Sequence, residues 1–329
     1  MYCIREGVMK HRLDDIVRET GYSTATVSRA LNGSSSVAEK TRLKILDAAR
    51  KTGYLRSERT IMLVVPNISM SYYYRWMVGE LETVLRFAGF RMELISIRDL
   101  ELIEEHNPSA VISIVTEDGL ERYWGKKYEI PLICINTMPR HLEGIFSVLS
   151  NEEQGMNTLL THLYSLGHRR IGLWGWNNIA TQQINVYSSR LRIQTFEQFL
   201  KSRSLPYNLI VNHSYSRGET EYSEAILRLL DQDVSAIVVM SEFEIIKVLY
   251  YLKLAGKRVP EDVSVCGWLS EEDFYSDPSV TGVMQNYNYL AKQALVMLNR
   301  VLHKAPIAED VVVDYNFFLR RSTASLKKN

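Results

Sequence analysis

Hydrophobic residues are spaced in two different ways along the chain, and the change falls near residue 60. Before that point apolar residues recur every three or four positions, which predicts short amphipathic helices over 12–21, 24–33 and 37–53. Each segment ends in a glycine, a common residue just beyond a helix C-terminus, and Ser23 is a natural N-cap for the second. We therefore expect a small bundle of three helices at the N-terminus.

After residue 60, short and continuously apolar runs alternate with amphipathic segments of helical period. Such runs are typical of parallel strands covered by helices on both faces. The predicted strands are 61–67, 91–97, 110–115, 132–136, 170–176, 209–213, 236–241 and 263–268, and the predicted helices are 76–90, 157–167, 192–203, 222–232 and 245–256. The tail, 287–321, adds one helix and a final pair of strands. A stretch of about 270 residues with this many strands predicts two lobes rather than one sheet.

Length and composition exclude several classes of protein. A chain of 329 residues that is 46% hydrophobic is too apolar to be disordered and too long for one small core. It contains no apolar run of the roughly 20 residues needed to span a bilayer. Its first residues also lack the apolar core of a secretory signal. We therefore expect a cytoplasmic protein with no membrane partner.

No metal site, cofactor or catalytic residue is predicted. Cys3, Cys134 and Cys266 are far apart and lack a nearby Cys or His, which argues against a disulfide framework or a zinc site. We interpret Cys134 and Cys266 as small buried hydrophobic residues because both stand in apolar runs. The chain has no G-x-S-x-G, P-loop, H-E-x-x-H or G-x-G-x-x-G motif. His168 stands in a helix-to-strand turn, where capping explains it better than chemistry.

Charge is distributed unevenly between the two parts of the chain. Residues 1–59 carry 12 Lys or Arg and 7 Asp or Glu, a net of +5, whereas the remaining residues carry 27 and 31, a net of −4. A basic head on a mildly acidic body favours a polyanion-binding module joined to something else.

The stretch YSTATVSRALNG, 22–33, gives this module a specific form. Four hydroxyl side chains and Arg29 crowd onto one short helix, which follows another helix after a tight turn at Gly21. This is the arrangement of a helix-turn-helix, whose second helix enters the major groove of DNA while hydroxyls and N–H groups at helix starts hold phosphates. The alternative is an ordinary capped surface helix, which the basic balance and the third helix argue against.

These residues resemble a known family. The stretch DDIVRETGYSTATVSRALNGSSSVAEKTRLKILDAARKTGY, 14–54, is similar to the N-terminal domain of the LacI/GalR family of bacterial repressors, which shows the pattern D-[VI]-A-x-x-A-G-V-S-x-x-T-V-S-R-x-L-N. Downstream, SLGHRRIGLWG, SRLRIQTFEQFL, AGKRVPEDVSVCGW and PSVTGVMQ resemble the effector-binding core of the same family. The resemblance extends from Leu13 to Arg321.

The resemblance implies an α/β fold with an N-terminal three-helix helix-turn-helix domain and a two-lobed, periplasmic-binding-protein-like core of parallel sheets. The expected boundaries are 9–55 for the DNA-binding domain, 56–60 for a short linker, and 61–329 for the effector-binding and dimerisation core, with one lobe at about 61–160 plus 288–320 and the other at 161–287.

The resemblance also implies roles for residues of the head. Thr24, Ala25 and Arg29 fall where the family reads bases, and Ser23, Thr26, Ser28, Asn32 and Thr41 fall where it holds phosphates. Arg29 is the side chain here that can make a bidentate contact to guanine, whereas Ala25 can at most touch a thymine methyl. Arg42 has two interpretations of equal weight: it contacts DNA, or it is a residue of the bundle surface.

One departure from the family pattern concerns the linker. The family usually carries a longer hinge of the form P-x-x-x-A-R-x-L, which folds into a short helix and inserts a leucine into the minor groove. Here LRSERTIML, 55–63, has neither the length nor the Pro and Ala-Arg elements. This difference argues against hinge-helix wedging and the DNA kink that it produces.

In the core, the resemblance implies a ligand cleft between the lobes, where aromatic rings meet sugar faces and polar groups meet hydroxyls. The expected effector contacts are Tyr73, Tyr74, Trp176, Asn177, Arg190, Glu242 and Trp268. Trp174, inside a β run, is interpreted as core. Leu269 and Glu242 each stand where relatives carry Asp, which implies an unusual sugar or sugar derivative, or else a lost response to small ligands. The short stretch 98–109 resembles regulators of β-galactosidase operons and hints at a galactoside.

Together these features predict a sequence-specific transcriptional regulator, a repressor of a carbohydrate-utilisation operon. It is expected to bind a pseudo-palindromic double-stranded DNA operator as a homodimer, with an affinity that a small sugar-like effector changes. Two alternatives are a solute-binding sensor with a vestigial DNA-binding head and an α/β sugar-processing enzyme. The intact helix spacing argues against the first and the absent motifs against the second. Because the family pattern begins near Leu13, we also expect the functional start at Met9 rather than Met1.

Overall fold

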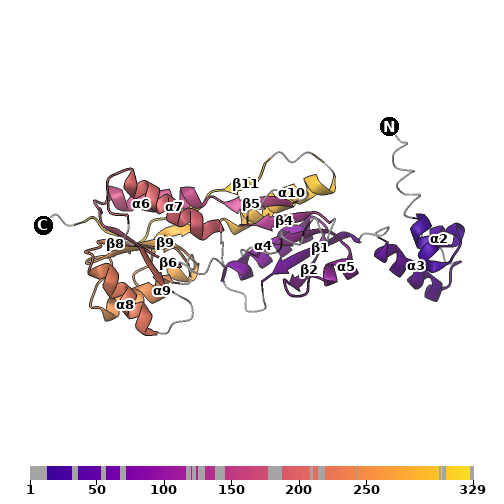
Figure 1. The fold of residues 1–329 in the computed structure, drawn as a ribbon, viewed down its shortest axis with the longest axis horizontal. Helices are drawn as coiled ribbons and strands as arrows, with labels where there is room; N and C mark the ends of the chain where they lie inside the picture. Colours follow the sequence, from indigo (N-terminus) through magenta and orange to yellow (C-terminus); the bar gives the residue numbers. More distant parts are fainter. Residues whose placement is uncertain are drawn as a thin grey trace.

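The computed structural model describes most of the chain and arranges it as three bodies in a row, with the N-terminal head at one end and the C-terminus at the other (Figure 1). The described residues are 13–31, 36–52, 57–66, 72–115, 120, 124, 130–137, 145–176, 187–207, 210–213, 219–242, 244–303, 305 and 309–326. For residues 50, 57–59, 104, 176, 210–213, 219–221 and 272 the description covers the backbone alone. Met9, the expected start, lies outside the described residues.

The head consists of a helix over 13–20, α2 (Thr24–Leu31) and α3 (Glu39–Lys51), as the apolar spacing predicted. Gly21 between the first two helices has φ +71°, a left-handed conformation that glycine adopts without strain. One small core holds the three helices together, built from Ile16, Val27, Ala30, Ile45, Ala48 and Ala49. The polar residues of α2 are therefore left on the outer face.

The first lobe is a parallel sheet with the strand order β11-β5-β4-β3-β1-β2. Its strands are β1 (Ser57–Val65), β2 (Arg91–Ser96), β3 (Pro108–Ser113), β4 (Leu132–Ile135), β5 (Ile145–Ser150) and β11 (Val311–Val313). Helices α4 (Tyr72–Phe87) and α10 (Tyr287–Leu302) cover one face, and α5 (Leu102–His106) lies over the other. Alternate residues of β1 point into the two cores, which explains why its apolar run is continuous.

The second lobe has the strand order β12-β10-β9-β8-β6-β7, parallel except for β12, which runs antiparallel to β10. Its strands are β6 (Ile171–Trp176), β7 (Ile210–His213), β8 (Ala236–Val239), β9 (Ser264–Trp268), β10 (Thr281–Met284) and β12 (Asn316–Phe318). Helices α6 (Glu152–Ser165) and α7 (Tyr187–Lys201) cover one face. Helices α8 (Glu219–Leu230) and α9 (Ile245–Leu254) cover the other, and a short 3-10 turn, η2 (Glu272–Phe274), follows β9.

Within the described residues the chain passes between the lobes at three places, after β5, after β10 and between β11 and β12. The crossings are tied to each other: the Asn151 backbone N–H donates to the Val313 carbonyl oxygen (2.8 Å), and its side-chain amide donates to Asp314 (2.7 Å). The Tyr315 N–H donates to the side chain of Gln154 (3.0 Å). The carboxyl ends of both sheets thus meet around a hydrogen-bonded set of connections.

Several predicted boundaries are wrong. Residues 57–60, expected in the linker, form the start of β1. Residues 152–160 belong to the second lobe, because the apolar face of α6 packs on the second sheet. The two tail strands do not pair with each other: β11 joins β5 in the first lobe, and β12 joins β10 in the second. Strands β5 and β10 were missing from the prediction.

Three predictions about single residues in the core are confirmed. Trp174 is fully buried in the second lobe, and Cys134 and Cys266 are buried free thiols. His168 has a structural environment: its Nδ1 lies 2.9 Å from the Ser235 hydroxyl and its Nε2 lies 3.0 Å from the Ala324 carbonyl oxygen. Burial lowers the pKa of His168, as expected for a neutral ring that joins a turn to the C-terminal segment. None of the described helices combines the length and the apolar character needed to cross a membrane.

Candidate functional site

The outer face of α2 carries the residues expected to contact DNA. The Ser23 hydroxyl accepts a hydrogen bond from the Thr26 backbone N–H (3.3 Å) and lies 2.9 Å from the Thr26 hydroxyl, so Ser23 caps the helix as predicted. Thr24, Ala25 and Arg29 are exposed and Ser28 is half-buried, whereas Val27 and Ala30 turn into the core. The helical period therefore separates a polar outer face from an apolar inner one.

Arg29 lies along this outer face. Its Nε–H donates to the Ala25 carbonyl oxygen one turn earlier (3.2 Å), which aligns the guanidinium with the helix surface. A planar guanidinium on the exposed face of a second helix has the geometry and the donors for a guanine edge. The chain supplies no acidic residue to α2, so nothing on this helix opposes an approaching phosphate.

The remaining head residues fall at the edge of this face or outside the described residues. Thr41 and Arg42 lie half-buried in the first turn of α3. The Nε of Arg42 is 3.7 Å from the carboxylate of Glu39 on the same helix, as the bundle-surface interpretation expects. Asn32 lies outside the described residues.

In the second lobe, beside a crossing segment, Arg192 on α7 contacts several elements at once. Its Nε–H donates to the Glu152 carboxylate (2.6 Å), one Nη donates to the Met240 carbonyl oxygen and the other donates to the Tyr315 hydroxyl (3.1 Å). Its guanidinium carbon lies 4.0 Å from the ring centroid of Trp268, a cation–π contact. Arg192 therefore joins α6, α7, the ends of β8 and β9, and a crossing segment.

Neighbouring groups stabilise the positive charge of Arg192. Burial alone would lower its pKa, but the Glu152 carboxylate and the Tyr315 hydroxyl outweigh burial and raise it. Sequence reasoning had selected Arg190, which the structure places on the exposed face of α7. Two helical residues stand about 200° apart around the axis, so Arg190 and Arg192 face opposite ways. The apolar spacing of α7, with Phe196 and Phe199 buried, was the available signal for Arg192.

Glu242 follows β8 and reaches the first lobe. One of its carboxylate oxygens accepts a hydrogen bond from the hydroxyl of Tyr287 (3.4 Å), which lies at the start of α10 in the first lobe. Burial raises the pKa of Glu242 to about 7, an effect that the charge of Arg192 opposes and that of Asp273 reinforces. This carboxyl group is therefore poised to change its protonation near neutral pH.

Tyr73 lies in the first turn of α4 and is buried, with its hydroxyl accepting a hydrogen bond from the Asn136 side-chain amide (3.2 Å). Asn136 also donates to Gln285 at a crossing (3.1 Å) and accepts from the Ser150 N–H (2.8 Å), which links three segments. Tyr74 packs edge-on against Tyr73, with ring centroids 5.0 Å apart. Sequence reasoning missed Asn136, whose φ of +58° marks it as a special backbone position.

Trp268 is 2% exposed, and its indole N–H finds no acceptor among the residues that the structure describes. A buried donor without a partner costs about 1–3 kcal/mol, which makes it a natural contact for a ligand oxygen. Leu269, the position expected to lack a polar group, turns into the second-lobe core instead. The side chain of Trp176 and the whole of Asn177 lie outside the described residues.

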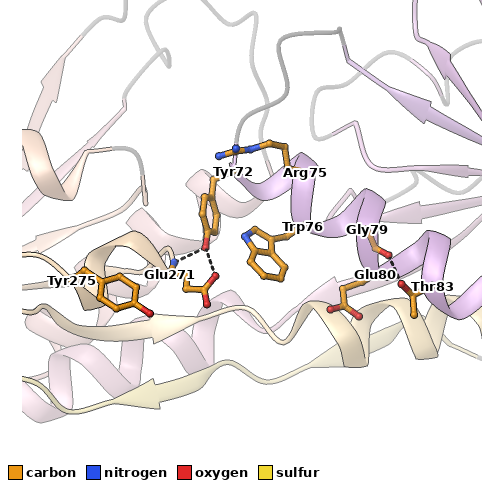
Figure 2. Close-up of a pocket in the computed structure, with 8 residues that line it drawn as sticks. All are labelled: Tyr72, Arg75, Trp76, Gly79, Glu80, Thr83, Glu271 and Tyr275. Atoms are coloured by element: carbon orange, nitrogen blue, oxygen red, sulfur yellow. Dashed lines mark hydrogen bonds between the residues drawn. The ribbon is translucent and has the colours of Figure 1, made fainter.

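An open groove of about 630 Å³ runs beside this region and is lined by both lobes (Figure 2). Tyr72, Trp76 and Glu80 come from one face of α4, and Glu271 and Tyr275 come from the segment after β9. The Tyr72 hydroxyl accepts a hydrogen bond from the Glu271 backbone N–H (2.8 Å) and lies 3.5 Å from the Glu271 carboxylate. Figure 2 shows this side chain pointing from α4 across the groove.

Two family models match the chain in the order that its domains follow. Residues 12–57 match "Bacterial regulatory proteins, lacI family", and residues 160–323 match "Periplasmic binding protein-like domain". Two similar proteins align over nearly the whole chain. The ribose operon repressor of Bacillus subtilis (strain 168) is 25% identical over 321 residues, which cover 91% of this chain and 94% of that protein. The transcriptional repressor CytR of Escherichia coli (strain K12) is 26% identical over 345 residues, which cover 95% and 96%.

Solved structures show the same architecture. The transcriptional regulator CelR in complex with cellobiose has a TM-score of 0.67 at 22% identity, covering 94% of this chain and 99% of that one. The lac repressor dimer bound to operator and the anti-inducer ONPF has a TM-score of 0.69 at 17% identity, covering 94% and 98%. At these identities the likeness concerns the fold. The family models give the chain a domain of the lacI family of bacterial regulatory proteins, followed by a periplasmic-binding-protein-like domain.

Proposed function

We propose that the protein is a transcriptional repressor that binds a pseudo-palindromic DNA operator and changes its operator affinity when a small carbohydrate binds between its lobes. The observation that carries this proposal is the outer face of α2, where a capped helix exposes Thr24, Ala25 and Arg29 while the opposite face packs in the head core. An operator on bacterial DNA also implies that the protein acts in the cytoplasm.

Selection of DNA from a random library by the full-length protein, followed by affinity measurements, tests the proposal. A bound sequence with two related half-sites is the expected result. Arg29→Ala should flatten the preference at one base pair in each half-site. Arg18→Ala is the matched control, because Arg18 is exposed on the first helix and pairs with Asp15 (3.1 Å). Failure to enrich any sequence would favour a solute sensor with a vestigial head.

The head offers a single short helix, α2, for contact with DNA bases. This supports binding of DNA by a homodimer. One small module buries too little surface for tight, specific binding, whereas two-fold symmetry matches a palindromic site. Sedimentation of the full-length protein at micromolar concentration should show a dimer with or without DNA. A monomer in both conditions would contradict this part of the proposal.

For the effector site, we propose four of the contacts expected from the sequence, Tyr73, Tyr74, Glu242 and Trp268. Arg192 takes the place of Arg190. Aromatic rings, a carboxylate and a guanidinium converge here from both lobes, which suits a polyhydroxylated ligand. Trp176 and Asn177 stay predictions. Relatives support a sugar: the solved structures include a regulator with bound ribose and one with cellobiose, while a galactoside has only the short stretch 98–109 in its favour.

A carbohydrate panel read by thermal shift tests this site. Trp268→Phe removes the unpaired N–H and keeps a smaller ring against Arg192 and Tyr315, so the shift caused by an active sugar should shrink. The melting temperature of each protein without sugar shows how much of the change comes from packing. Arg190→Ala, on the exposed face of α7, is the control that should keep the shift. Equal shifts in the wild type and Trp268→Phe would place the sugar elsewhere.

A further inference from the structure

The DNA-binding head is joined to the first lobe by a very short connection. Thr52 closes the last turn of α3, because both its backbone N–H and its hydroxyl donate to the Ala48 carbonyl oxygen (2.9 Å each). Strand β1 begins at Ser57, which pairs with Pro108 of β3 in the first sheet. Four residues, 53–56, therefore separate the end of the head from the first lobe.

The length of this connection limits how far the head can move from the lobe. A fully extended chain spans at most about 3.3–3.6 Å per residue, so the path from Thr52 to Ser57 reaches no more than about 18 Å. One turn of DNA is about 34–36 Å long, roughly twice that reach. The head is therefore unable to move far along DNA while its lobe stays in place.

The head also lies close to the lobe. Helix α3 lies beside α5 of the first lobe, and α2 is on the far side of α3 (Figure 1). The charges on the two sides are opposite: α3 carries five Lys or Arg and two Asp or Glu, a net of +3, whereas 99–105, around α5, carries four Asp or Glu and no Lys or Arg, a net of −4. Opposite charges favour this arrangement, which leaves α2 directed away from the lobe.

We propose that the head is a fixed extension of the first lobe, so that the core of the protein sets the separation of the two operator half-sites. The consequence for DNA rests on the repressor function and the homodimer proposed above. In a dimer, the packing of the two cores decides how far apart the two α2 helices stand. Neither connection has the reach to compensate for a misplaced half-site, so the half-site spacing becomes part of what the protein recognises.

Nitrogen-15 relaxation of the full-length protein, without DNA, tests whether the head is fixed. Amides of the head and of the lobes should give one rotational correlation time. A twelve-residue Gly-Ser insertion after Gly53 lengthens the connection to sixteen residues, with a root-mean-square span of about 22 Å. The correlation time of the head should then fall below that of the lobes. A wild-type head that already tumbles faster than the lobes would overturn the proposal.

The matched control carries the same insertion after Gly256. This glycine is exposed in the turn after α9, and nothing lies within 4 Å of the position that a Cβ would take. The insertion adds the same length of chain to the second lobe, far from the connection. The head of this variant should keep the correlation time of the wild type.

The same three proteins are then titrated with two operators, the selected one and one with five more base pairs between its half-sites. Half a turn of DNA moves a half-site by about 17 Å and turns it to the opposite side of the duplex. The wild type and the Gly256 insertion should bind the longer operator about 100-fold to 10,000-fold more weakly, because one head no longer reaches its half-site. The Gly53 insertion should lose less than about tenfold.

Equal affinity of the wild type for both operators would overturn the proposal. A Gly53 insertion that discriminates as strongly as the wild type would also overturn it, because the connection would then not limit the spacing. If the wild type binds neither operator in a sequence-specific way, the repressor function is wrong. The relaxation measurement uses no DNA, so it separates that failure from the failure of a fixed head.

Discussion

The DNA-binding head and the interlobe site are assembled in opposite ways. In the head, five of the residues expected to contact DNA lie on α2, a helix of eight residues, and the helical period alone separates them from the core: Thr24, Ala25, Thr26, Ser28 and Arg29. In the interlobe site, neighbouring side chains come from α4, α6, α7, the ends of β8 and β9, and the crossing segments. A substitution in its small core should therefore unfold the head. The interlobe site should instead be disrupted by the removal of a single charged side chain.

The largest expected effect is at Arg192. Arg192→Ala leaves the carboxylate of Glu152, which is 1% exposed, without its charged partner, and this should lower the free energy of unfolding by about 3–5 kcal/mol. Arg190→Ala, two residues away on the exposed face, should change it by less than about 0.5 kcal/mol. Urea unfolding of the three proteins measures both. Equal losses would contradict the distinction between the two faces of α7.

The next effect concerns the head. Ile45 is fully buried in the core of the head. Ile45→Ala should lower the free energy of unfolding of the head by about 2–5 kcal/mol, which is most of the stability of so small a module. We expect DNA binding to be lost while the unfolding of both lobes stays unchanged. Fluorescence anisotropy on the selected operator measures the binding, and calorimetry measures the unfolding. Leu43→Ala is the control, because Leu43 is 57% exposed on the same helix. A lowered core transition would show that the head and the lobes unfold as one unit.

Arg29→Ala should have a smaller effect, confined to recognition. We expect specific operator binding to weaken by about 1–3 kcal/mol, with non-specific DNA binding reduced far less. The head should keep its stability, because Arg29 is exposed. Titrations against operator and against a scrambled duplex at one salt concentration separate the two. An equal loss on both duplexes would make Arg29 a phosphate contact.

The last expected effect is a dependence of stability on pH. Because burial raises the pKa of Glu242 to about 7, the folded protein keeps a proton that the unfolded chain releases above about pH 4.3. Wild-type stability should therefore fall relative to Glu242→Gln as pH rises from 5 to 7, and the difference should level off above pH 8. Glu80→Gln provides the control with an exposed carboxylate contact. Parallel curves for the wild type and Glu242→Gln would show that Glu242 titrates normally.

The comparison also shows which errors sequence reasoning makes. Glu242 and Trp268 were expected at strand ends and lie at the ends of β8 and β9, since parallel strands bring their carboxyl ends to one edge. Arg190 was chosen over Arg192 because a motif match gives a segment, whereas the packing of α7 decides which arginine turns inward. Asn136 and Glu152 carry no motif, and they enter the site through contacts with residues more than ten positions away.

The sequence by itself determined the three-helix head, its capped second helix, the alternation of strands and helices, and the burial of Trp174. All of these follow from periodicity and from neighbours within a few residues, so local physics is enough to predict them. The tertiary structure decided the three crossings between the lobes, the separation of the two tail strands into different sheets, and the contact of Glu242 with Tyr287 of α10. These features depend on which surfaces pack together between segments that are far apart in the sequence. Such packing leaves no periodic pattern of apolar and polar residues from which it could be predicted.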